Sequence, residues 1–222
     1  MHEFPTPTPV TAVLDIPAGR IRLIAADRTD TTVEILPADP TRSRDVQAAQ
    51  QVTATHGNGV LRIEAPPAPN RLLGARGAVE VTVQLPTRSH VEATAAHAEL
   101  RGVGRLGDVT FTGQQATVEL DETLSAHLTT QAGDISVGRL GGPARISTLK
   151  GDIRIAQATQ GTVTLSTDSG DISISAAPET SASLDAGTPH GRIHNSLKNT
   201  GGTPALDIHA TTSHGDITAR SL

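Results

Sequence analysis

The chain has 222 residues and a formal net charge of −5, with no Cys, Trp or Tyr and only two Phe. The lack of cysteine excludes disulfides and cysteine-ligated zinc or iron–sulfur clusters, and the acidic balance argues against a nucleic-acid-binding surface, which would be basic. A globular core of this size normally uses several aromatic side chains, so the composition favours a narrow interior filled by Ile, Val, Leu and Ala.

A Pro/Thr-rich lead occupies residues 1–9. It has no basic start and no apolar run, so it does not have the form of a secretory signal. No later stretch approaches the 18 consecutive apolar residues that indicate a membrane-spanning helix. We therefore expect a cytoplasmic protein with no membrane span.

Residues 1–88 are expected to form an irregular β cap that continues into the sheets of the following part. Alternating or β-branched stretches predict short strands, which we place at 10–16, 19–23, 31–36, 52–55, 59–64 and 79–85. The segment His56-Gly57-Asn58-Gly59 is typical of a tight hairpin turn. Residues 41–51 fit either a short helix, capped by Asp39 with Pro40 in its first turn, or a polar loop. Residues 65–78 form a surface loop or a boundary.

Residues 89–222 carry a repeat. The triplets Gly133-Asp134-Ile135, Gly151-Asp152-Ile153 and Gly170-Asp171-Ile172 follow one another at steps of 18 and 19 residues. Each row alternates apolar and polar residues, as a strand with one buried face does, and no row can bury its own apolar side. Stacked rows would pair each strand with the next coil and share one core, which predicts a β-solenoid. The anchoring positions, expected to stack in chain order, are 100, 118, 135, 153, 172, 193 and 217.

The repeated Gly-Asp-Ile rows, together with the opening segment 18–30 and the strand over 81–86, resemble the bacterial putative-adhesin β-strand-repeat family. The resemblance covers nearly the whole chain. It implies an all-β, single-stranded right-handed β-helix, here with about seven regular coils, and no established enzymatic activity. It transfers no catalytic residues.

Equivalent residues of successive coils should form columns along the solenoid. The column before each anchor contains the candidate ligand-binding residues Asp134, Asp152, Asp171, Arg192 and Asp216. One interpretation is an edge that binds a divalent cation or a polyol, with carboxylates roughly 5 Å apart. The other is a row of turn residues whose carboxylates cap backbone amides beside glycine.

Three histidines give a second candidate site. His190 and His214 occupy one column, with His194 and also His209 expected close by, so imidazoles from adjacent strands could bind Zn²⁺ with Asp216 as a further ligand. The alternative is a set of exposed corner histidines. A hydroxyl column at Thr129, Ser147, Ser166 and Thr211 could bind sugar or ice, although ordinary strand propensity also explains it.

Three functions remain open from the sequence. No nucleophile, phosphate-loop or dinucleotide-binding motif is present, which favours a non-catalytic, adhesin-like, scaffold or partner-binding module with a protein or glycan partner. A small-ligand, metal or carbohydrate-acting protein that uses the C-terminal His/Asp edge is the first alternative, with a divalent cation as the cofactor it would need. Self-assembly through unpaired strand edges, as a homodimer or an end-to-end stack, is the second.

Overall fold

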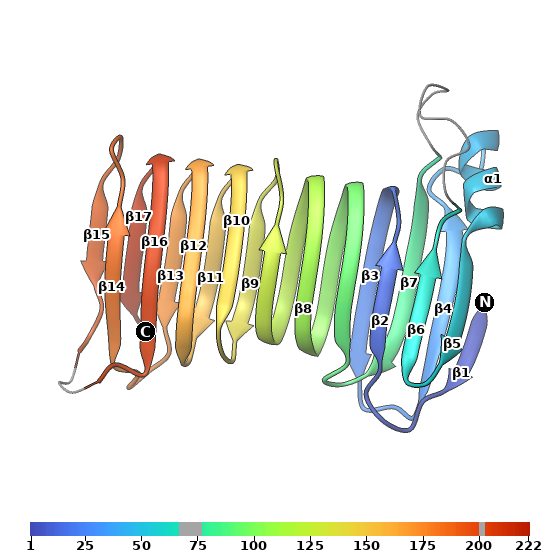
Figure 1. Cartoon of the computed structure of the whole chain (residues 1–222), viewed down its shortest axis with the longest axis horizontal. Coiled ribbons are helices and arrows are strands. Elements are labelled where there is room, and N and C mark those ends of the chain that lie inside the picture. The colour runs from blue at the N-terminus through green and yellow to red at the C-terminus, as the bar shows by residue number, and fades with distance from the viewer. Residues whose placement is uncertain (67–76, 200–202) are drawn as a thin grey trace.

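The computed structural model describes residues 1–66, 77–199 and 203–222, so most of the 65–78 loop lies outside the described residues. The described chain is almost entirely β and winds as a stack of coils with two walls of opposite strand direction (Figure 1). The first wall contains β2 (Thr11–Asp15), β6 (Val60–Glu64), β10 (Ala144–Lys150), β12 (Gly161–Ser169), β14 (Ala182–Gly187) and β16 (Leu206–His214).

The second wall contains β3 (Ala18–Ala26), β7 (Val79–Pro86), β9 (Ile135–Leu140), β11 (Ile153–Ala158), β13 (Ile172–Ala176), β15 (Ile193–Ser196) and β17 (Ile217–Ser221). The long strand β8 (His90–Thr129) runs through both walls, pairing with β2 and β10 on the first and with β3 and β9 on the second. Parallel pairing between equivalent residues of different coils is what stacking of a repeat requires.

The apolar anchors form a continuous buried column. Ile153 pairs in register with Ile135 on one side and with Ile172 on the other, and all three side chains are at most 1% exposed. The predicted all-β, solenoid-like architecture is therefore confirmed. The right-handed winding and the count of about seven coils stay predictions.

The coils at the C-terminal end do not stack in chain order, contrary to expectation. Ile172 pairs with Ile217, and Ile217 pairs with Ile193. The last coil of the chain, β16–β17, thus lies between the coil β12–β13 and the coil β14–β15 (Figure 1). The N-terminal end has the same arrangement, because β2–β3 lies between β6–β7 and the first turn of β8.

Two polar residues explain why the coil β14–β15 occupies the outermost position. Asn195 stands in the inward column in which Val137, Ile155, Ile174 and Ala219 are buried. An amide at that place inside the stack would need a hydrogen-bond partner, whereas at the end it remains exposed and accepts the N–H of Leu197. The second polar residue is Arg192, which stands at the position that aspartate occupies in the neighbouring rows at Asp171 and Asp216.

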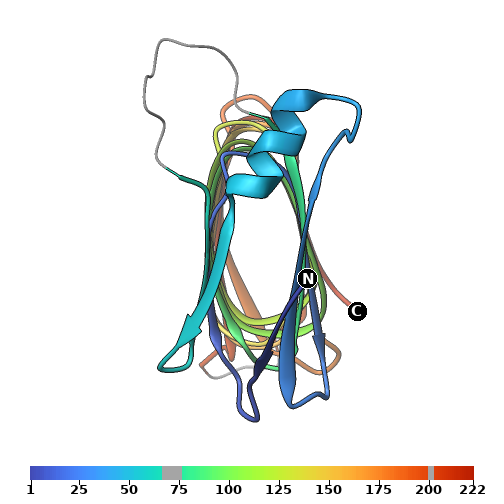
Figure 2. The ribbon, with the colours of Figure 1, turned by 90° about the vertical axis from the view of Figure 1, so that its right-hand side faces the viewer.

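The N-terminal end is closed differently. β4 (Asp30–Pro37) pairs antiparallel with β7, β1 (His2–Pro5) pairs antiparallel with β4, and β5 (Thr53–Gly57) pairs antiparallel with β6. Asn58 and Gly59 have φ of 52° and 75°, which confirms the predicted hairpin turn between β5 and β6. Helix α1 (Ser43–Gln51) crosses this end (Figure 2) and starts later than an Asp39 cap would place it, because Arg42 is extended; Asp39 caps the preceding turn by accepting the N–H of Thr41.

Candidate functional site

The acidic column forms a hydrogen-bonded ladder along the second wall. An Oδ1 of Asp134 accepts the backbone N–H of Asp152 at 2.9 Å, and Asp152 accepts that of Asp171 at 2.9 Å. Asp171 in turn accepts the N–H of Asp216 at 2.8 Å, and Asp216 accepts the N–H of Arg192 at 2.9 Å. Each carboxylate therefore caps the amide of the equivalent residue one coil further on, as the capping interpretation describes.

The corner before each aspartate requires glycine. Gly170 has φ of +151° and Gly215 has φ of +150°, a region that residues with a side chain rarely enter. A Cβ at Gly170 would also overlap the carbonyl oxygen of Gly151 in the neighbouring coil. The Gly-Asp pair is thus one structural unit: glycine lets the corners stack closely, and aspartate binds the amide that the corner leaves free.

The ladder ends at Arg192. Its side chain has no acceptor for another amide, so the row of aspartate caps stops at this coil. The Arg192 guanidinium instead donates to Oδ2 of Asp216 at 2.8 Å. This bond, together with the backbone N–H of Arg192, holds the pKa of the Asp216 carboxyl below its usual range, and Asp216 raises the pKa of Arg192.

The predicted histidines gather only in part. The rings of His190 and His214 stack at a centroid distance of 4.8 Å, on adjacent coils that pair at these two residues. His194 lies on β15 opposite Thr218 and, with Arg192, Ile193, Asp216 and Thr218, lines a shallow hollow of about 460 Å³. Within residues 1–66, 77–199 and 203–222, no three His, Asp or Glu side chains are placed to bind one metal ion.

The hydroxyl column lies on the first wall. Ser147 pairs in register with Thr129 and with Ser166, and Ser166 pairs with Thr211. The Ser147 hydroxyl donates to Oγ1 of Thr129 at 3.3 Å. The next threonine of each row points inward, where the hydroxyls of Thr167 and Thr212 donate to carbonyl oxygens of the neighbouring coil.

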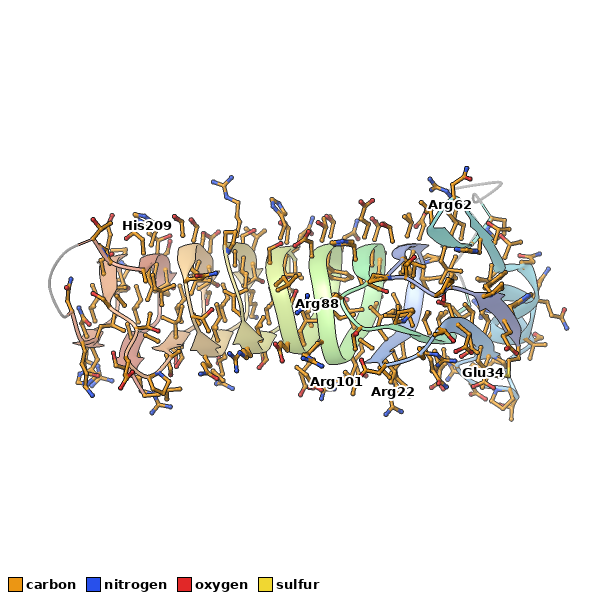
Figure 3. All side chains as sticks on the ribbon, turned by 90° about the horizontal axis from the view of Figure 1, so that it is seen from below. Arg22, Glu34, Arg62, Arg88, Arg101 and His209 are labelled. Carbon is orange, nitrogen blue, oxygen red and sulfur yellow. The ribbon has the colours of Figure 1, made fainter. Side chains whose placement is uncertain are left out.

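The same wall carries a group formed by Asp185, Asp207 and His209; the sequence placed His209 near His190 and His214, but its two acidic partners were missed. Nε2 of His209 is 3.2 Å from Asp207, and its Nδ1 is 3.5 Å from Asp185 on the outermost coil. The hydroxyl of Ser183 donates to Asp207. This hydrogen bond and the nearby His209 hold the pKa of the Asp207 carboxyl below its usual range. Figure 3 shows His209 on the opposite side of the stack from Arg22 and Arg101. Asp185 and His209 stand in register where β14 pairs with β16.

Residues 11–220 match the family described as Toastrack DUF4097. The chain belongs to the Toastrack family. This confirms the resemblance to β-strand-repeat adhesin-like proteins and is consistent with the stacked coils described above. No curated protein matches the chain in sequence.

Several solved structures are similar to this chain at low identity. A putative adhesin from Parabacteroides distasonis is 11% identical with a TM-score of 0.52, over 98% of this chain and 95% of that one. A putative adhesin from Bacteroides fragilis is 12% identical with a TM-score of 0.42, over 98% and 95%. A putative cell adhesion protein from Clostridium sporogenes is 9% identical with a TM-score of 0.41, over 100% and 98%. Only the first of these has a TM-score above 0.5, and at 11% identity it supports an argument about the fold alone.

In this Toastrack chain, the helix found among the described residues has nine residues and is too short to cross a membrane. The residues expected to do chemistry mostly support the coil stack. The carboxylates of Asp134, Asp152 and Asp171 each already accept a backbone amide.

Proposed function

We propose that this Toastrack protein is a non-catalytic, adhesin-like binding module that holds a protein or glycan partner on its first wall. The observation that carries the proposal is a column of hydroxyl side chains whose residues pair in register on neighbouring strands: Thr129, Ser147, Ser166 and Thr211. Parallel pairing spaces these hydroxyls about 4.8 Å apart, and each can donate and accept hydrogen bonds. In this proposal residues 1–88 form the cap and residues 89–222 form the coils that carry the wall.

A neighbouring column adds cationic and polar groups beside the hydroxyls. His127 pairs with Arg145, Arg145 with Thr164, and Thr164 with His209. Arg145 is exposed and can bind a carboxylate or sulfate on a partner. The two columns together form a flat polar surface, which suits an extended partner better than a small molecule that needs a cavity.

The test compares matched serines on the two walls. Ser166 on the first wall and Ser173 on the second are both half-buried strand residues that can be changed to lysine. The proteins are screened on an array that contains neutral, sialylated and sulfated glycans. We expect Ser166→Lys to weaken binding at least tenfold and Ser173→Lys to leave it unchanged. Equal losses in both variants, or cleavage of a bound glycan, would contradict the proposal.

A second candidate function is binding of a divalent metal at the C-terminal edge. The stacked His190–His214 pair favours it, because two imidazoles from adjacent strands lie within reach of one ion. Zn²⁺ should then raise the melting temperature of the wild type, and this rise should disappear in His214→Ala. An unchanged melting temperature with Zn²⁺ would remove this candidate. The cytoplasmic location stays a prediction, which cell fractionation tests.

A further inference from the structure

The outermost coil, β14–β15, has two outer strand edges that pair with no other strand in the described structure, although the N–H of Ala182 at the start of β14 donates to the carbonyl of Lys198. β14 pairs only with β16, and β15 pairs only with β17. The carbonyl of Arg192 accepts the N–H of Ile217, so the backbone groups of Ile193 point away from the stack. On the other wall the carbonyl of Ser181 accepts the N–H of Leu206. By the same alternation, the backbone groups of Leu184 and Ala186 point away from the stack. These groups form a template for added strands.

The same end exposes part of the apolar column. Ile193 stands in register with Ile217, but its side chain is 47% exposed whereas that of Ile217 is fully buried. Leu184 and Ala186 on the other wall are half-buried and pack against the core. Neither β14 nor β15 contains the Lys or Pro with which edge strands commonly block pairing.

The charges of this end differ between its walls. On β14 the side chain of Asp185 is 84% exposed. Beside β15 the side chain of Arg192 is 88% exposed, and the exposed His194 follows two residues later. One edge of the coil is therefore acidic and the other cationic, and the hollow beside β15 has Ile193 in its lining.

We propose that the β14–β15 coil is the dimer interface for a second copy of this chain, which is related by a two-fold axis parallel to the strands. Such an axis keeps the strand directions and exchanges the walls, so that β14 of each copy pairs antiparallel with β15 of the other. Residues equally far from the corner then face each other. Asp185 lies opposite His194 of the second copy, with Arg192 of that copy diagonal to it.

Charge decides between the two possible two-fold arrangements. An axis perpendicular to the walls would pair β14 with β14 and β15 with β15, which places the acidic edge against its own copy and the cationic edge against its own copy. Like charges directly opposite are destabilising, whereas the proposed axis makes two equivalent Asp–His/Arg contacts. This interface goes beyond the partner-binding wall, because it uses the end of the stack and leaves the hydroxyl column free.

The dimer is closed rather than a growing fibre. The N-terminal end presents the antiparallel strands β1 and β5, with Pro5 in β1 and α1 across the end, so it does not continue the parallel coil register. A C-terminal end therefore matches only another C-terminal end. Such an isologous contact is satisfied after two copies have joined.

The test is sedimentation velocity of the full chain from about 1 to 200 μM, with charge reversal and rescue. We expect a monomer–dimer equilibrium in the wild type and a dissociation constant raised at least tenfold in Asp185→Arg and in His194→Asp. The double variant recreates both contacts and should return to within about threefold of the wild type. Glu92→Arg, on the first wall away from this end, and Ser166→Lys serve as controls that should dimerise normally.

A second test traps the dimer with a disulfide, so it does not require the charge-reversed variants to fold. The chain has no cysteine, and residues 185 and 194 lie on opposite walls of one copy. The variant carrying Asp185→Cys and His194→Cys should therefore form a covalent dimer on mild oxidation, while each single cysteine should give much less. A wild type that is monomeric at 200 μM, species that grow beyond the dimer, or loss of dimer without rescue in the double variant would overturn the proposal.

Discussion

The carboxylate of Asp171 accepts the backbone N–H of Asp216 at 2.8 Å, across 45 positions of sequence. This bond joins the coil β12–β13 to the last coil of the chain, whereas the next coil in sequence, β14–β15, lies further out. The aspartate ladder therefore follows the spatial order of the coils rather than the order of the chain, and it stops at Arg192 on the outermost coil.

Removing one carboxylate from the ladder should destabilise the fold through a lost amide cap. We expect Asp171→Ala to lower the free energy of unfolding by about 1–2 kcal/mol, the usual cost of losing such a cap. Asp171→Asn keeps an acceptor oxygen and should lower it by less than about 1 kcal/mol. Urea unfolding followed by far-ultraviolet circular dichroism measures both. Equal losses would show that charge, rather than the amide bond, is what matters.

The corner glycine should tolerate substitution poorly. Gly170→Ala forces a side chain into φ of +151° and against the Gly151 carbonyl, so we expect a loss of at least about 3 kcal/mol. Gly187 provides the control, because a Cβ there meets nothing and its φ is not in the left-handed region. If Gly170→Ala unfolds at the same urea concentration as Gly187→Ala, the corners of neighbouring coils do not stack as closely as described.

The bond between Asp216 and Arg192 should make stability depend on acid pH. The pKa of Asp216 is lowered in the folded state from an ordinary value of 3.8. Its contribution is therefore complete above about pH 4 and is lost as the pH falls through the lowered folded value. Arg192→Met removes the guanidinium, so the stability gap between wild type and variant should be open at pH 6 and narrow below pH 4. A gap that is constant from pH 6 to pH 2.5 would count against the ion pair.

Two isoleucines of the same column should differ in their effect on stability. Ile217 is fully buried inside the stack, whereas Ile193 is 47% exposed at its end. Ile217→Ala should therefore cost about 2–4 kcal/mol, and Ile193→Ala less than about 1.5 kcal/mol, measured by urea unfolding at a concentration at which the protein is monomeric. If the coils stacked in chain order, the larger loss would belong to Ile193.

The repeat was enough to predict the stack but not the order of its ends. Period-two alternation and the Gly-Asp-Ile spacing place Ile135, Ile153 and Ile172 side by side, because no row can bury its own apolar face. The steps leading to Ile193 and Ile217 are 21 and 24 residues, long enough for either stacking order.

Polar residues in the terminal rows carried the missing signal. Asn195 occupies a column of buried apolar side chains, and an unsatisfied buried amide is costly, so its row belongs at an end. Arg192 cannot cap a further amide, which agrees with its place in the last row of the ladder. Asn195, compared with its equivalents in the other rows, therefore carries the clearer signal for the observed order.

The coil order can be tested most directly by disulfide trapping in this cysteine-free chain. Ser173 and Thr218 are in-register neighbours on adjacent strands, about 4.8 Å apart, within the roughly 4.4–6.8 Å that a disulfide spans. Ser173 and His194 are two strands apart, at about twice that distance. We expect rapid intramolecular disulfide formation in the variant with Ser173→Cys and Thr218→Cys, and little in the variant with Ser173→Cys and His194→Cys. Mass spectrometry of the monomer measures both. The reverse result would contradict this order of the coils.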